Sequence, residues 1–150
     1  MLLNRRNAGW GVLAVGIVLF ESCTTYYISV ASLKQQFAGI DSSKLKDVVV
    51  QGPAFEKYYY KANPITAIRC TDDHNIPYEL ENKPSIEMRI TYGYKSHRTI
   101  FYFDRVFLTQ NTMIGVESRF ISAIRKTIPL DSITRIEVQD GHKRFTYVNK

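Results

Sequence analysis

The chain has 150 residues, a formal net charge of +6 and a hydrophobic content of 45%. This length fits one domain, and the apolar content is too high for a disordered chain. The excess of lysine and arginine suits contact with anionic headgroups or acidic cell-wall polymers.

An apolar run close to the N-terminus predicts an export signal. Arg5 and Arg6 precede an uncharged stretch at residues 8–20, and Cys23 follows it. This stretch has 13 residues. It is shorter than the roughly 20 residues of a transmembrane helix and falls in the range of a signal-peptide core. Because positive flanks stay in the cytoplasm, the arginines predict that the rest of the chain is translocated.

The residues before Cys23 resemble the lipobox of bacterial lipoproteins, in which a small residue precedes an invariant cysteine. Ser22 and Cys23 match that pattern, whereas Phe20 and Glu21 depart from it. The resemblance implies cleavage after Ser22 and attachment of a diacylglyceryl group, with fatty acids such as palmitate, to the Cys23 sulfur. By the same analogy, Thr24 rather than Asp after the cysteine implies an outer-membrane anchor that faces the periplasm.

Two other interpretations of the N-terminal run stay open: an uncleaved transmembrane anchor, and the start of a buried helix. Export makes nucleic acid an unexpected partner, because none is normally found outside the cytoplasm. Lipid on Cys23 would also leave Cys70 without a second cysteine for a disulfide in an oxidising compartment. Cys70 is therefore expected to be a buried thiol that shares one strand face with Ile68.

The chain after Cys23 begins with short elements separated by strong turn signals. Residues 24–31 are β-branched and aromatic and predict a strand. Ser32 and Gln35 form a capping box for a helix that runs to about Phe37 and ends at Gly39. A polar turn, three strands and an edge strand are then predicted at residues 41–46, 45–51, 55–62, 65–71 and 78–80.

The second half of the chain alternates more regularly. Ile86, Met88 and Ile90 alternate with polar residues, which is typical of a half-buried antiparallel strand. Asp140 and Gly141 form the strongest short turn signal and predict that the last two strands make a hairpin. Strands are predicted at 85–92, 99–103, 105–109, 113–116, 133–139 and 143–148, and a short amphipathic helix or irregular strand at 119–126.

A run of structural residues marks the last third of the chain: Ile128, Pro129, Leu130, Ile133, Ile136 and Val138. Ile128 ends a strand and Pro129 fixes a turn, and the aliphatic residues after it are expected in the core. The run resembles small bacterial domains of the pleckstrin-homology-like kind. That resemblance implies a PH-like fold, and a generic small barrel or sandwich with the same turn is the alternative.

The predicted fold class is mainly β: a small antiparallel β-barrel or sandwich with one or two short helices, after an N-terminal signal or anchor helix. Residues 1–22 are assigned to the signal peptide. Residues 23–45 are assigned to the lipidated cysteine, a tether and the short helix, and residues 46–150 to the β-rich domain.

The sequence carries no recognisable catalytic or metal-binding motif. His74, His97 and His142 lie in expected turns, without the spacing of a metal site. Asp72, Asp73 and His74 offer ligand atoms in a row, but adjacent residues seldom converge on one ion, so a solvated loop is expected. We therefore predict no catalytic residue, no metal and no cofactor.

Tyrosines and a basic residue from two predicted strand regions form the candidate binding patch. Its residues are Tyr58, Tyr60, Tyr92, Tyr94, Arg98 and Tyr102. Rings supply contact area and hydroxyls supply hydrogen bonds, a combination that suits sugars, peptides or headgroups. The alternative is that tyrosine serves only its strand propensity.

The sequence as a whole predicts a lipid-anchored cell-envelope protein that binds or scaffolds and is not an enzyme. Its expected partners are membrane lipid, through acylated Cys23, and an envelope protein or cell-wall polymer. One alternative is an envelope hydrolase with a site assembled from distant residues, which a pocket containing His74 or His97 with a carboxylate would indicate. The other is a single-pass, membrane-anchored PH-like signalling module.

Overall fold

The structure is a computed structural model that describes residues 24–149. The predicted signal peptide and Cys23 lie outside the described residues. Within residues 24–149, no helix has both the length and the apolar character needed to cross a bilayer.

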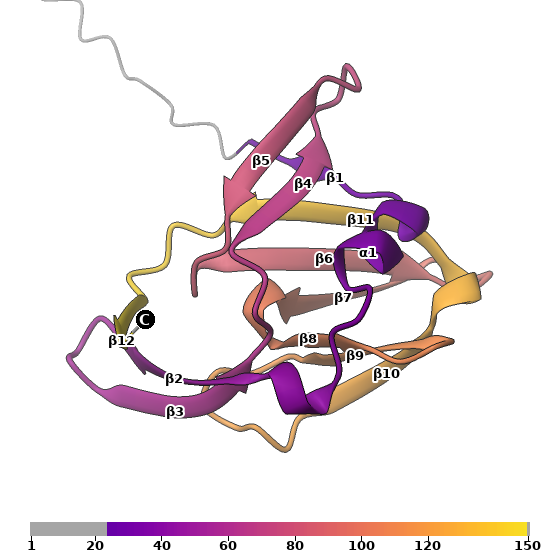
Figure 1. The fold of residues 1–150 in the computed structure, drawn as a ribbon. Helices are drawn as coiled ribbons and strands as arrows, with labels where there is room; N and C mark the ends of the chain where they lie inside the picture. The colour runs from indigo at the N-terminus through magenta and orange to yellow at the C-terminus, as the bar shows by residue number, and fades with distance from the viewer. Residues whose placement is uncertain (1–23, 150) are drawn as a thin grey trace, which may run out of the picture.

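The described chain is mainly β, as predicted, and its strands pair antiparallel. The large sheet has six strands in the order β5-β4-β1-β11-β6-β7 (Figure 1). Their bounds are β1 Tyr26–Tyr27, β4 Ala67–Thr71, β5 Pro77–Glu81, β6 Ile86–Tyr92, β7 His97–Tyr102 and β11 Ile133–Asp140. The predicted edge strand is confirmed, because β5 ends the sheet beside β4.

Two smaller sheets of three strands each complete the fold (Figure 1). One has the order β10-β9-β8, formed by β8 Val106–Leu108, β9 Thr112–Val116 and β10 Arg125–Pro129. The other has the order β12-β2-β3, formed by β2 Lys46–Gln51, β3 Lys57–Ala62 and β12 Thr146–Asn149. The arrangement is consistent with the predicted small β-sandwich.

The one α-helix of the described residues, α1 (Val30–Gln36), begins before the predicted capping box. Its N-cap is Ser29, whose extended backbone lets the hydroxyl oxygen accept a hydrogen bond from the Ser32 backbone N–H at 3.1 Å. The prediction of Ser32 as the cap residue is therefore wrong by one turn. Gly39 takes a left-handed φ of 74° just after the helix, where glycine was expected to end it.

Three short 3₁₀ turns connect the strands: η1 (Ser42–Lys44), η2 (Phe103–Arg105) and η3 (Leu130–Ser132). η1 forms the predicted polar turn, with the Asp41 carboxylate accepting from the Ser43 backbone N–H at 2.8 Å. η3 follows Pro129 directly, as the sequence run around that proline predicts.

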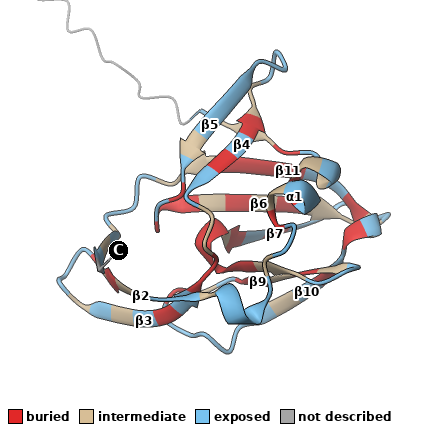
Figure 2. Ribbon diagram, in the orientation of Figure 1, coloured by how far each residue is buried: buried red, intermediate tan, exposed pale blue. Residues whose placement is uncertain are grey.

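The main core joins the large sheet, α1 and the β8–β10 sheet (Figure 2). Predicted inward residues are confirmed as buried: Ile86, Met88, Ile90, Leu130, Ile133, Ile136 and Val138. A second, small core of Val50, Tyr60 and Ala62 lies under β2 and β3. The strand periodicity therefore identifies most of the main core, because alternate side chains of a strand share one face.

The predicted C-terminal hairpin is wrong. The chain does not turn back at Asp140 and Gly141: the Gly141 backbone N–H donates to the Ser85 carbonyl oxygen at 3.0 Å, which extends the pairing of β11 with the β6 side, and residues 141–145 form no regular element. The last strand, β12, pairs with β2 in the small sheet rather than with β11. β6 pairs along one edge of β11, and β1 pairs with Glu137 and Val138 on the other edge, so a strand returning from Asp140 would meet β1.

The predicted amphipathic helix or irregular strand at 119–126 is also largely wrong. Residues 117–124 form an irregular loop, and β10 begins only at Arg125. The Arg119 side chain is 2% exposed. Burial of this arginine, rather than a regular amphipathic pattern, dictates the course of the loop.

Substitution of Gly115 by alanine should lower the free energy of unfolding. A Cβ atom at Gly115 would overlap the ring of Phe101, which is fully buried. Overpacking of this kind costs about 1–3 kcal/mol. Urea denaturation of wild type, Gly115→Ala, Phe101→Leu and the double variant measures it. Leucine at position 101 is smaller than phenylalanine and relieves the overlap. The free energy of unfolding should therefore fall less in the double variant than the sum of its decreases in the two single variants. Strict additivity would contradict this account.

Candidate binding site

A cleft of about 620 Å³ opens between η1, the end of β3 and the β8–β10 sheet. Its apolar lining residues are Ile40, Leu45, Phe107, Leu108, Ile114 and Val116. The charged side chains that line it are Asp41, Lys61, Arg105 and Arg125. Its volume falls in the range of small-molecule binding sites, roughly 300–1,000 Å³.

The pleat of β8 and β9 explains why apolar side chains reach this cleft. Val106 and Met113 are buried in the main core. Their neighbours Phe107 and Ile114 pair across the two strands and therefore share the opposite face. That face lines the cleft, so this small sheet is apolar on both sides.

Arg105 lies at the cleft with its side chain almost completely buried, the residue being 3% exposed. Its Nη1 donates to the Ser118 carbonyl oxygen at 2.9 Å and its Nη2 to the Ser122 hydroxyl at 3.0 Å. The guanidinium carbon lies 4.5 Å from the centre of the Tyr60 ring. The Nε atom has no hydrogen-bond partner.

Arg105 forms no ion pair of its own within residues 24–149, although the nearby Asp104 carboxylate acts on it electrostatically. Burial lowers the pKa of Arg105 because it removes water from the charged guanidinium. An arginine nevertheless stays protonated in proteins, so the cleft holds a desolvated positive charge.

A buried polar cluster lies beside the cleft and centres on Asp104, which is fully buried. Its Oδ2 accepts hydrogen bonds from the Tyr60 hydroxyl at 2.5 Å and from the Tyr147 hydroxyl at 3.0 Å. Arg119 donates to the Tyr60 hydroxyl at 2.7 Å, and its Nη2 lies 3.6 Å from Asp104 Oδ1. We call these four residues the Asp104 cluster.

Aromatic rings enclose the arginine of the Asp104 cluster. The Arg119 guanidinium carbon lies 3.8 Å from the Tyr102 ring centre and 5.1 Å from that of Phe145. Burial and the Asp104 charge raise the pKa values of Tyr60 and Tyr147, so both hydroxyls stay protonated and donate. The burial of Arg119 could not be predicted, because nothing in the local sequence pattern separates it from a solvent-facing arginine.

The structure divides the candidate binding patch into two groups. Tyr60 and Tyr102 both contact Arg119, and the Tyr58 ring lies near Phe145 at 6.2 Å. The other group, Tyr92, Tyr94 and Arg98, lies at the opposite end of the β6–β7 hairpin. The register places it there, because Tyr92 pairs with His97 whereas Tyr102 pairs with Glu87.

The second group contains one strongly exposed ring. Tyr94 is 93% exposed, whereas Tyr92 packs against the His97 ring at 5.8 Å. Arg98 lies 3.5 Å from the buried Glu137 carboxylate. Tyr60 is thus the one member of the candidate binding patch that lines the cleft.

Cys70 is a buried thiol, as predicted. Its sulfur donates to the Tyr78 carbonyl oxygen at 3.4 Å, and burial raises its pKa to about 11. Ile68 is buried on the same strand face. The thiolate is therefore scarce at neutral pH, which makes this cysteine a poor nucleophile.

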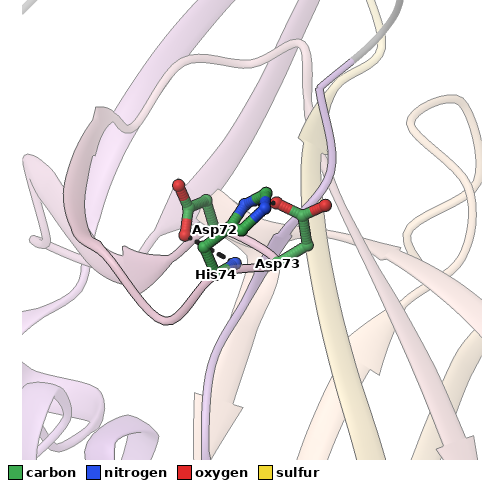
Figure 3. A group of neighbouring side chains, drawn as sticks. All are labelled: Asp72, Asp73 and His74. Carbon is green, nitrogen blue, oxygen red and sulfur yellow. Dashed lines mark hydrogen bonds and ion pairs between the residues drawn. The ribbon is translucent and has the colours of Figure 1, made fainter.

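Asp72, Asp73 and His74 converge more closely than expected for adjacent residues (Figure 3). Their ligand atoms all lie within 4.8 Å of one another, and Asp73 Oδ1 lies 2.7 Å from His74 Nδ1. The turn between β4 and β5 accounts for this, since Asp72 accepts from the backbone N–H groups of His74 and Ile76 at 2.9 and 2.8 Å. Asp73 and His74 are exposed, in agreement with the expected solvated loop.

Comparisons of the chain with protein-family models, curated proteins and solved structures return no match. The candidate site therefore rests on the cleft and on the Asp104 cluster beside it.

Substitution of Asp104 by asparagine should destabilise the protein strongly. The change leaves the buried Arg119 charge without a counter-ion, and breaking a buried pair costs about 3–5 kcal/mol. Asp47→Asn is the matched control, because Asp47 pairs with Lys61 at 3.0 Å on the surface, where such pairs contribute little. Thermal and urea unfolding of both variants measure the difference. Similar losses in the two variants would contradict the assignment of Asp104 as the buried anchor of the cluster.

Proposed function

We propose that this chain is a lipid-anchored cell-envelope protein whose β-rich domain binds a ligand and does not catalyse a reaction. The observation that carries the binding role is the cleft of about 620 Å³ beside the Asp104 cluster. The anchor is proposed from the lipobox resemblance at Cys23, with the domain facing the periplasm from the outer membrane.

The chemistry of the cleft favours binding over catalysis. No histidine or cysteine among the described residues lines it. The Asp41 carboxylate is held in its own turn by the Ser43 backbone N–H and hydroxyl, and these hydrogen bonds lower its pKa. Lys61 is paired with Asp47. The lining therefore lacks the paired nucleophile and base that a hydrolase of the alternative kind requires.

An acyl anchor would act by confinement. β1 begins at Tyr26, three positions after Cys23, so the folded domain would start almost at the membrane surface. Confinement raises the effective concentration of the cleft for ligands in or near the envelope membrane. Buried acyl chains supply about 0.8 kcal/mol per methylene, so several chains give a stable anchor.

The anchor is tested by intact mass and fatty-acid labelling of the full chain expressed in a bacterial host, with Cys23→Ala beside wild type. We expect a mature species that begins at a lipid-modified Cys23 and that the variant does not form. Cys70→Ala is the matched control and should be labelled like wild type, because this thiol is buried. An unlabelled chain that retains Met1 would contradict the anchor and favour the single-pass signalling module.

The cleft is tested with a neutral, apolar photoreactive probe, a diazirine-bearing hexadecanol, added to the full-length protein in zwitterionic vesicles. We expect cross-links on the peptides that carry Phe107 and Ile114, and a large loss of them in Ile114→Trp, whose indole would fill the cleft. Ile100→Trp is the control, because Ile100 is 44% exposed on β7 away from the cleft. Equal labelling of the two variants, or none in wild type, would overturn the binding role.

A further inference from the structure

The cleft combines an apolar wall with more positive than negative side chains. Four charged side chains line it: Asp41, Lys61, Arg105 and Arg125. Lys61 is paired with Asp47 at 3.0 Å, and Asp41 is held in its turn by Ser43. Neither Arg105 nor Arg125 forms an ion pair within residues 24–149, and the Asp104 carboxylate that acts on Arg105 from nearby is itself paired with Arg119.

The two arginines are held on the same loop residue. The Ser122 hydroxyl accepts from Arg105 Nη2 at 3.0 Å, and its carbonyl oxygen accepts from Arg125 Nε at 3.2 Å. Burial lowers the pKa of Arg105, Tyr60 and Asp104 oppose this shift, and the positive charges of Arg119 and Arg125 add to it. An anion placed between Arg105 and Arg125 would relieve the repulsion between them and give both an ion-pair partner.

Arg105 gives stronger evidence for an anion-binding site than Arg125 does. A buried guanidinium that forms no ion pair and leaves an N–H without an acceptor is costly, and protein structures rarely keep one. Here the guanidinium is fixed by Ser118, Ser122 and the Tyr60 ring while its Nε remains unpartnered. A rigid, desolvated donor of this kind is suited to a planar anion, because a guanidinium binds a carboxylate through parallel N–H donors.

The rest of the lining indicates what the anion is attached to. Phe107, Leu108, Ile114 and Val116 come from β8 and β9 and form a continuous apolar wall, which Ile40 and Leu45 extend. A free inorganic anion would gain nothing from this wall. An acyl chain would bury its methylenes against this wall, and removing that apolar surface from water favours binding.

We propose that the cleft binds a single-chain fatty acid, with its carboxylate at Arg105 and Arg125 and its acyl chain along the apolar wall of β8 and β9. The proposal rests on the proposed binding role of the cleft and names its ligand class. The volume of about 620 Å³ suits one small amphiphile rather than a macromolecule.

The test compares three probes of equal chain length on the full-length protein in zwitterionic vesicles: diazirine-bearing hexadecanoic acid, hexadecanol and hexadecyl phosphate. We expect the acid to label the cleft peptides about tenfold more than the alcohol, because charge-assisted hydrogen bonds are stronger than neutral ones. In Arg105→Met this advantage should disappear while labelling by the alcohol is retained. Arg98→Met is the matched control, because Arg98 does not line the cleft.

A second variant protects the test against misfolding of Arg105→Met. Arg125 is exposed at the start of β10, so Arg125→Met should fold and should lower acid labelling severalfold with the alcohol unchanged. Equal labelling by acid and alcohol in wild type would overturn the proposal and leave the binding role intact. Stronger labelling by the phosphate than by the acid would also overturn it, in favour of a phosphate-headed amphiphile. Absence of labelling by every probe would instead overturn the binding role itself.

Discussion

The fold depends on one buried carboxylate. Asp104 lies in η2, where the chain passes from the large sheet to β8, and it accepts from a tyrosine of β3 and a tyrosine of β12. Arg119 brings the β9–β10 loop to the same point. Buried charges are tolerated only when they are paired and hydrogen-bonded, so these four side chains must assemble together. This requirement positions the small β12-β2-β3 sheet, whose own apolar core contains only three buried residues.

The same junction shapes the cleft. Tyr60 donates to Asp104 with its hydroxyl and covers the Arg105 guanidinium with its ring, so it belongs to both sites. Asn63 reinforces the junction, because its side-chain amide donates to the carbonyl oxygens of Phe103 and Val106 at 2.7 and 3.2 Å. Asp104, the neighbour of Arg105 in the chain, forms its ion pair with Arg119 and acts on Arg105 only electrostatically. Arg105 is therefore left as a fixed, buried donor at the cleft.

Local patterns in the sequence carry most of the information about the main core. The alternation of Ile86, Met88 and Ile90 and the run from Ile128 to Val138 predict buried faces that the structure confirms. Strand periodicity depends only on neighbouring residues, so it is readable from one chain. Asp140 and Gly141 have the local signature of a hairpin turn, but no hairpin forms there, because β6 pairs with one edge of β11 and β1, more than 100 positions away along the chain, pairs with the other.

By itself the sequence determined a mainly antiparallel β domain, its principal core faces and the burial of Cys70. Only the tertiary structure decided where β12 pairs, that Arg119 is buried, and that Phe107, Ile114 and Arg105 border one cleft. The physical reason is that hydrophobic alternation is a local property, whereas a buried ion pair and a cleft arise from segments far apart in the chain. Tyr60 and Asp104 are separated by 44 positions, and Tyr60 and Arg119 by 59, yet they form one hydrogen-bonded cluster.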